Sequence, residues 1–300
     1  MPKFFLKTAV VAAFVVSAAP ALAQRDFSDV EIKTTDLGAG VYMLEGAGGN
    51  IGLSVGEDGA FVIDDQFAPL ADKIVAAIAE VSDKPVEFVV NTHWHGDHTG
   101  GNEEMSDLGA HIVAHDNVRQ RLKEGMSRDD GRVTPAAPEG ALPVITFSHS
   151  MLFYWNGHDI RVWHPENAHT DGDAIIFFKD ANIVHMGDVF FNGWYPYIDL
   201  ESGGDMDGYI STHEKVLSKV DDETRIIPGH GPLASKADLQ NTVDMLKEVR
   251  VRVQRMIDDG MSEDEVVAAS PLADLDDEWS WQFINGERMT RMAYRSLSTE

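Results

Sequence analysis

Three histidines and an aspartate fall within six consecutive residues of this sequence, in the segment HWHGDH (93–98). His93 and His95 alternate with period two, so at the end of a strand their side chains point the same way. Asp97 and His98 follow a glycine, which permits a sharp turn. Three imidazoles and a carboxylate that converge in this way call for a cation. The mixed nitrogen and oxygen ligands suit zinc first, with iron, manganese or cobalt as alternatives.

Further candidate ligands occur later in the chain, each in a glycine-containing loop beside a predicted strand. His169 lies in ENAHTDGD, Asp188 ends a strand in HMGD, and His230 follows a strand in IIPGHGP. Binding sites in α/β folds are built in such loops, at the carboxyl ends of strands. The alternative is a chance histidine-rich loop at residues 93–98, and the later motifs disfavour it because they supply the remaining ligands.

The segments that position these residues form two strand-rich halves with accompanying helices. Strands are predicted at 30–34, 40–45, 50–55, 60–64, 86–91, 110–115, 173–179, 182–188 and 225–228, with a hairpin at 151–165. Helices are predicted at 69–82, 116–125, 205–220 and 236–258, and a long polar loop at 128–143. Asp116 is the predicted cap of the second helix. The pattern suggests a four-layer α/β sandwich, and because no proline-rich or serine-rich linker interrupts it, residues 24–300 are predicted to form a single domain.

The first 23 residues are typical of a secretory signal peptide. Lys3 and Lys7 precede an apolar run at 9–19, and small residues lead to a cleavage site after Ala23. A membrane anchor is the alternative, but the run is short for a span of about 20 residues. We therefore expect a periplasmic or secreted protein, with no membrane association after cleavage.

The composition narrows the classes of partner and chemistry. The net charge is −26, and loss of the two signal-peptide lysines leaves −28, so a phosphate backbone would be repelled and nucleic acid is not an expected partner. A small-molecule substrate is expected instead. The chain contains no cysteine. Disulfides and thiolate ligands or nucleophiles are therefore excluded.

The motifs HWHGDH, HTDGD, MGD and PGHG, in this order, resemble those of the metallo-β-lactamase superfamily across essentially the whole mature chain. The resemblance implies an αββα sandwich with two zinc ions in the groove between its halves. One metal would be held by His93, His95 and His169. The other would be held by Asp97, His98 and His230, with Asp188 between the two. By the same resemblance Asp64 would support the metal loop from outside, and the start of a turn is an equally weighted reading of it.

The resemblance also bears on the reaction. A zinc-bound water loses a proton near neutral pH, so we predict a binuclear hydrolase that uses a metal-bridging hydroxide, with Asp97 as the catalytic residue that orients it. Export and the compact domain favour opening of the β-lactam ring of antibiotics, and thus a role in antibiotic resistance. Asp188 favours a lactonase, thioesterase or phosphodiesterase, because superfamily β-lactamases commonly carry cysteine or a non-ligand serine there. A non-catalytic periplasmic metal-binding accessory protein is the alternative from another class.

The segment FFNGWYPYID (190–199) is rich in aromatic residues and turn formers and follows Asp188 directly. Asn192, Trp194, Tyr195 and Tyr197 are candidates to stack on a substrate or to hydrogen-bond it. Packing of the aromatic rings against the sandwich is the alternative, and the two interpretations carry equal weight.

Overall fold

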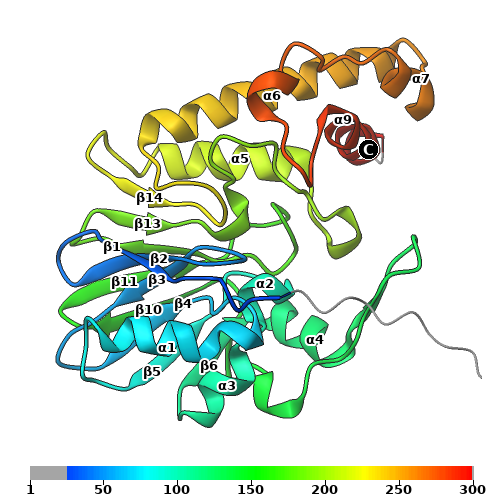
Figure 1. Ribbon diagram of the computed structural model, residues 1–300. Helices are drawn as coiled ribbons and strands as arrows, with labels where there is room; N and C mark the ends of the chain where they lie inside the picture. Colours follow the sequence, from blue (N-terminus) through cyan, green and yellow to red (C-terminus); the bar gives the residue numbers. More distant parts are fainter. Residues whose placement is uncertain (1–25, 299–300) are drawn as a thin grey trace, which may run out of the picture.

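In the computed structural model, which describes residues 26–298, two β-sheets pack face to face and each carries helices on its outer side (Figure 1). The predicted signal peptide at 1–23 lies outside the described residues. Within the described part of the chain, no helix is both long enough and apolar enough to cross a bilayer.

The first sheet contains seven strands in the order β1-β2-β3-β4-β5-β6-β9. They are β1 (Lys33–Asp36), β2 (Val41–Glu45), β3 (Ile51–Ser54), β4 (Ala60–Ile63), β5 (Val86–Val90), β6 (His111–His115) and β9 (Ile145–Phe147). Strands β1 to β4 pair antiparallel, whereas β4, β5, β6 and β9 pair parallel. Parallel neighbours need crossover connections, and helices supply those between β4, β5 and β6. Because β5 ends at Val90, the histidine-rich segment begins at its carboxyl end.

The second sheet contains five strands in the order β10-β11-β12-β13-β14. They are β10 (Ser150–Trp155), β11 (His158–Trp163), β12 (Ile175–Phe178), β13 (Ile183–His185) and β14 (Arg225–Ile227). The β10–β11 hairpin turns at Asn156 and Gly157, whose φ angles of 51° and 78° match the turn type that favours this residue pair.

A short third sheet corrects the prediction of a polar loop at 128–143. Strands β7 (Met126–Ser127) and β8 (Val133–Thr134) pair antiparallel, and the hairpin projects as an arm beside α4 (Figure 1). Two-residue strands carry too little periodicity to be read from sequence. Arg128 of this arm contacts the buried Asp199.

Nine α-helices accompany the sheets in the described residues. Those of the first half are α1 (Ala71–Ala79), α2 (Gly96–Thr99), α3 (Asn102–Asp107) and α4 (Asp116–Glu124). Those of the second half are α5 (Met206–Leu217), α6 (Lys236–Asp258), α7 (Glu263–Ala268), α8 (Asp276–Trp279) and α9 (Gly286–Leu297). The cap of α4 is His115, whose ring accepts the Asn117 N–H, and not the predicted Asp116. Asp116 instead accepts a hydrogen bond from Ser148.

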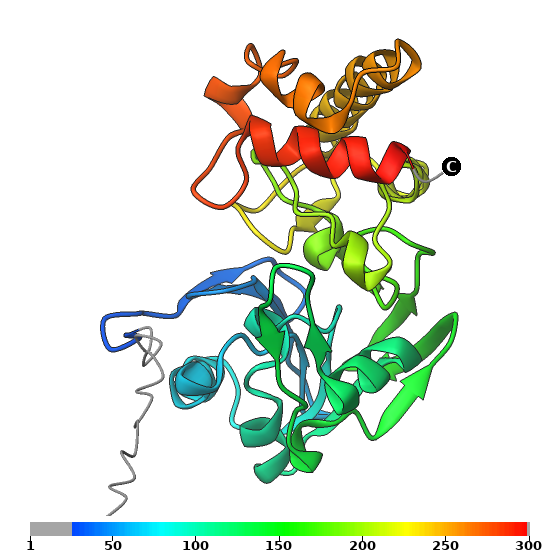
Figure 2. The ribbon, with the colours of Figure 1, turned by 90° about the vertical axis from the view of Figure 1, so that its right-hand side faces the viewer.

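Three apolar interfaces separate four layers. Ile74 of α1 packs on the outer face of the first sheet, and Phe61 and Ile176 meet between the sheets. Ile175 faces the opposite way and joins the cluster with α5, α6 and α9. Figure 2 shows α6, α7 and α9 gathered at one end of the molecule and the N-terminal half at the other. Burial of each large apolar side chain in these interfaces stabilises the folded state by about 1.5–3 kcal/mol. The predicted four-layer αββα sandwich is confirmed.

Candidate metal centre

The seven predicted ligands meet at one end of the two sheets, in loops from both halves. Residues 93–98 follow β5, His169 precedes β12, Asp188 lies in a short 3₁₀ turn after β13, and His230 follows β14. Close backbone approach makes this convergence possible. A Cβ atom at Gly229 would lie 2.1 Å from the Asp188 Oδ1 atom, so only glycine fits there.

His93, His95 and His169 form the first group of converging ligand atoms, together with one oxygen of Asp188. The Nδ1 atom of His95 lies 3.1 Å from Nε2 of His93 and 3.0 Å from Nε2 of His169. The Asp188 Oδ2 atom lies 3.7 Å from Nε2 of both His93 and His169. Four donor atoms therefore surround one point.

Each ring of this triad has its other nitrogen engaged outside the group. Nδ1 of His169 lies 2.7 Å from the Tyr197 carbonyl oxygen, so this nitrogen carries the hydrogen and donates it. Nε2 of His95 lies 2.8 Å from the Asp199 carboxylate, and the same reasoning applies. The inward nitrogens of His95 and His169 then hold lone pairs that face each other. Tetrahedral zinc with bonds of about 2.0–2.1 Å separates its ligand nitrogens by roughly 3.3 Å, so the donor set fits this ion.

Asp97, His98 and His230 form the second group. The Asp97 Oδ2 atom lies 3.4 Å from Nε2 of His230 and 3.9 Å from Nε2 of His98. Asp188 reaches this group with its other oxygen, because Oδ1 lies 3.0 Å from His98 Nε2 and 3.3 Å from His230 Nε2. Oδ1 is also a buried oxygen without a hydrogen-bond partner among the described residues. A carboxylate that offers one oxygen to each triad has the geometry of a bridging ligand.

The carboxylate of Asp64 supports the second group from outside. One oxygen accepts the Thr92 N–H at 2.7 Å, and the other lies 2.7 Å from both the Thr92 hydroxyl and Nδ1 of His98. Asp64 is fully buried, with a φ of 62°. The carboxylate therefore keeps a hydrogen on Nδ1 of His98 and directs a cation to Nε2.

Well over half of the 300 residues match a known family. The family model of the metallo-β-lactamase superfamily matches residues 44–230. The chain belongs to this superfamily. It is a metallohydrolase-type protein with a metal-binding cluster of histidines and aspartates.

Relatives in the superfamily carry several activities. The chain is 28% identical to a probable metallo-hydrolase, YqgX, of Bacillus subtilis over 53% of its own length and 75% of that protein. It is 24% identical to a type 2 metallo-β-lactamase of Bacillus sp. (strain 170), with 59% of this chain and 64% of that protein covered. A hydroxyacylglutathione hydrolase of Polaromonas sp. is 28% identical, with 54% of this chain and 55% of that protein covered. The chain thus spans less than two thirds of the last two.

Solved structures of low identity show the same fold. A metallo-β-lactamase from Pontibacter korlensis gives a TM-score of 0.60 at 18% identity, covering 72% of this chain and 99% of the other. The sec-alkylsulfatase Pisa1 of a Pseudomonas species gives a TM-score of 0.67 at 17% identity, covering 88% of this chain and 50% of the other.

The pKa values of two histidines in the first ligand group are shifted in the opposite direction from those of two histidines in the second. Burial lowers the pKa of His93 well below its usual value and that of His169 to about 4, so both rings are neutral at pH 7. Burial acts in the same direction on His98 and His230, but nearby carboxylates, Asp188 above all, outweigh it. They raise the pKa of His98 well above its usual value and that of His230 to about 9. A metal at the second group therefore displaces protons on binding.

Sequence reasoning missed a second supporting carboxylate, Asp199. It lies at the end of the aromatic segment, is buried, and faces Nε2 of His95. Arg128, from the β7–β8 arm, donates to both of its oxygens at 2.7 and 2.8 Å. Burial raises the pKa of Asp199, but the Arg128 guanidinium outweighs this effect and holds the pKa well below its usual range. Nothing in the sequence around either residue marks the pair, because they are 71 positions apart.

The glycine-rich loop GAGGN (46–50) packs against the second group. The Gly49 N–H donates to the Asp97 carbonyl oxygen at 3.0 Å. A Cβ atom at Gly49 would lie 2.0 Å from the Cε1 atom of His98. The absence of a side chain here is therefore a condition for the position of a ligand, a role beyond the shaping of a hairpin.

A cleft of about 490 Å³ opens beside the ligands. One wall is aromatic, and its rings belong to Phe191, Tyr197, Trp281 and Phe283. Arg128 and Arg132 of the β7–β8 arm also line the cleft, and they pair with Asp199 and Asp130 respectively. Trp281 and Phe283 come from the segment between α8 and α9, for which the sequence analysis made no prediction. A substrate with an apolar body and a negative group suits such a cleft.

Of the four predicted substrate-binding residues, Tyr197 lines the cleft, and Asn192, Trp194 and Tyr195 do not. The Asn192 amide donates to the Pro232 carbonyl at 3.0 Å. Trp194 stacks on Trp281 with ring centroids 5.1 Å apart, so it supports the wall. Tyr195 is buried, and its hydroxyl lies 3.3 Å from Asp276. Direct contact of these residues with a substrate stays a prediction.

Proposed function

We propose that this chain is a zinc-dependent hydrolase of small molecules that opens a strained or activated acyl bond, with the β-lactam ring as the first substrate to test. The observation that carries the proposal is Asp188, whose two oxygens face two complete ligand groups at the floor of the cleft. Two zinc ions bound there would lower the pKa of a coordinated water towards neutrality and stabilise negative charge on the attacked group.

The protein groups prepare the cleft for this chemistry. Enclosure raises the pKa of Asp97, but His98 and His230 outweigh that effect and hold the pKa well below its usual range. The Asp97 carboxylate is therefore ionised at neutral pH, faces the cleft, and can orient a nucleophile and accept its proton. The aromatic wall would hold the apolar body of the substrate, and Arg132, which pairs with the exposed Asp130, would exchange that partner for a substrate carboxylate.

The β-lactam proposal is supported by the predicted export of the chain and by the fold shared with metallo-β-lactamases over nearly their whole length. The test is a substrate panel on protein of measured zinc content. We expect turnover of nitrocefin and a carbapenem, and loss of that turnover on chelation. Fully metallated protein that hydrolyses neither would remove the β-lactam proposal.

A thioesterase is the second candidate, and Asp188 is the observation that favours it. An acidic bridging residue differs from the cysteine or serine expected of superfamily β-lactamases, and a hydroxyacylglutathione hydrolase is among the relatives. Including a glutathione thioester, a lactone and an aryl phosphodiester in the same panel ranks these alternatives. Zinc binding without turnover of any of them would indicate the accessory metal-binding protein instead.

The proposed place of action is the periplasm or the extracellular medium, and the proposal rests on the signal-peptide pattern at 1–23. Mass spectrometry of the protein expressed with its leader tests it. We expect a mature N-terminus at Gln24 in the periplasmic fraction. Retention of Met1 in the cytoplasmic fraction would contradict the proposal.

A further inference from the structure

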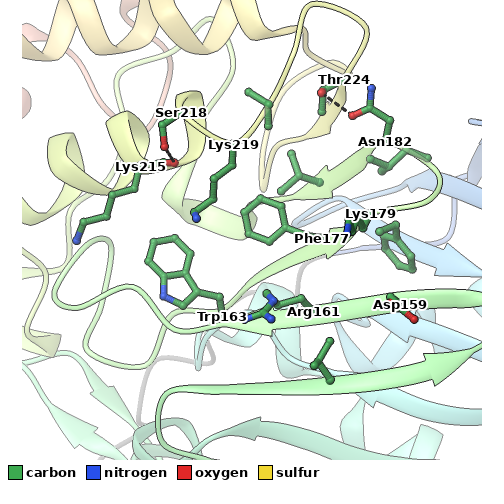
Figure 3. Close-up of a pocket in the computed structure, with 15 residues that line it drawn as sticks. Asp159, Arg161, Trp163, Phe177, Lys179, Asn182, Lys215, Ser218, Lys219 and Thr224 are labelled. Atoms are coloured by element: carbon green, nitrogen blue, oxygen red, sulfur yellow. Dashed lines mark hydrogen bonds between the residues drawn. The ribbon is translucent and has the colours of Figure 1, made fainter.

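A second cavity, of about 820 Å³, lies on the outer face of the second sheet, and it shares no lining residue with the metal cleft. Strands β11, β12 and β13 form its floor, and the last turn of α5 with the residues that follow forms its upper wall (Figure 3). Helix α5 ends at Leu217, and Leu152 of β10, which also lines the cavity, is 45% exposed.

Positive charge is concentrated around this cavity. Arg161 and Lys179 belong to the sheet side, whereas Lys215 lies in the last turn of α5 and Lys219 just beyond its end (Figure 3). None of these four cations forms an ion pair with another described residue, although the net charge of the chain is −26. Asp159 is the single acidic residue in the lining.

Several cations elsewhere on this surface form ion pairs, whereas these four gather at one cavity without one among the described residues. Lys33, Lys84 and Lys247 each face a glutamate, and Arg252 contacts both a glutamate and an aspartate. Unpaired like charges gathered at a concave surface repel one another and attract anions. These cations also line the same cavity as aromatic rings, which distinguishes them from lysines on an open, solvated surface.

The floor is apolar and aromatic. Trp163 and Phe177 are only partly buried, and the two side chains lie between Lys219 and Arg161 in Figure 3. Phe178, Ile183, Val184 and Val220 add to the apolar lining. Flat rings beside cations offer a stacking or apolar surface next to a charge partner, the combination that binds an organic anion.

We propose that this cavity binds a small organic anion, with an aromatic or short aliphatic body on Trp163 and Phe177 and a carboxylate, sulfonate or sulfate group held by Lys215, Lys219 and Arg161. A second copy of the chain is a poorer occupant. In a two-fold dimer built on this face, the same cations would meet across the interface. Binding here is independent of the metal centre and of the reaction proposed for it.

The test compares two fluorescent probes that differ only in charge. 1-Anilinonaphthalene-8-sulfonate carries a sulfonate, and N-phenyl-1-naphthylamine has the same ring system without it. We expect one saturable site for the sulfonate on the full-length mature protein, with an affinity that falls as salt rises. The neutral probe should bind more weakly.

The variant Lys215→Gln with Lys219→Gln should weaken sulfonate binding about fivefold, the loss of two exposed ion pairs, and leave binding of the neutral probe unchanged. Lys123→Gln is the matched control, since Lys123 is also exposed and has no ion pair but lies on α4. Arg132→Gln, at the metal cleft, should also have no effect. Arg161→Gln, on the floor of the cavity, should also weaken sulfonate binding.

Three results would overturn the proposal, provided that circular dichroism shows each variant to be folded. The first is sulfonate binding that the paired lysine variant does not weaken. The second is equal weakening for both probes, which would show that the lysines only shape the cavity. The third is a dimer by sedimentation that the lysine variant dissociates, because a second copy would then occupy the face.

Discussion

Replacement of Asp64 by asparagine tests how this fold prepares His98 for a metal. The backbone tolerates the change, because asparagine readily adopts the positive φ of 62° found at this position. The amide oxygen can keep the hydrogen bond from the Thr92 N–H, which places the NH₂ group against Nδ1 of His98. That ring nitrogen must then accept, so the hydrogen moves to Nε2, the nitrogen that faces Asp188 and His230.

The expected magnitude follows from this change of tautomer. A hydrogen bond to a charged group contributes about 1.5–3 kcal/mol, and loss of the carboxylate behind a metal-binding histidine typically lowers metal affinity 10- to 100-fold. We expect Asp64→Asn to weaken one of the two zinc equivalents by about 10- to 100-fold. The other equivalent should stay, since His93, His95 and His169 do not contact Asp64 through their inward nitrogens.

The assay is zinc titration against a competing chromophoric chelator, with urea unfolding of the zinc-free proteins beside it. Asp65→Asn is the matched control. Asp65 is equally buried, but its side chain contacts the Gly101 N–H and no ligand side chain, and one of its oxygens has no partner among the described residues. Burial also raises its pKa well above the usual value, which favours the uncharged form that an amide resembles. Unchanged affinity for both zinc ions in folded Asp64→Asn protein would refute the reasoning.

Three further changes have defined outcomes. Gly49→Ala should abolish binding of one zinc equivalent in equilibrium dialysis, because the added methyl group would lie 2.0 Å from the His98 ring; retention of both equivalents would show that the loop yields. Phe283→Ala should raise KM about 2- to 12-fold with little change in kcat, the loss of an aromatic contact of about 0.5–1.5 kcal/mol at the cleft wall, and an unchanged KM would place the substrate elsewhere. Burial lowers the pKa of His213 to about 4, so stability is present above the unfolded pKa near 6.5 and is lost as the pH falls towards 4. The free energy of unfolding, measured with urea, should therefore fall by about 2 kcal/mol less in His213→Leu than in the wild type between pH 7 and pH 5. Equal falls in the two proteins would contradict this assignment.

The sequence predicted the strands well where burial is periodic. The prediction at 86–91 and the observed β5 agree, although this short run is predicted from its apolar content and not from periodicity. The small hairpin at 126–134 was not predicted, because its strands are only two residues long and Arg128 is held by Asp199. No local pattern encodes a contact between such distant residues. Helix α9 was missed although Asn285 caps it and its apolar residues have helical spacing. The cap and the spacing are both features of the local sequence.

Ligands and their supports differ in how visible they are in a sequence. A histidine or aspartate in a glycine-containing loop after a strand carries its chemistry in its residue type, so the ligand set could be proposed before the fold was known. Asp199 and Trp281 act through position alone, and their residue types are as common in solvated loops and in cores.

The rigidity of the centre comes from layers that the ligands themselves do not reveal. The carbonyl of Asp188 accepts a hydrogen bond at 2.9 Å from Tyr209, a fully buried residue of α5. Asp188 is thereby tied to the outer helical layer, while Asp64 ties His98 to the end of β4 in the opposite sheet. A bridging carboxylate can face two ligand groups only if both halves of the sandwich hold their register. The apolar contact between the sheets, where Phe61 meets Phe178, is therefore a condition for the metal centre as well as for stability.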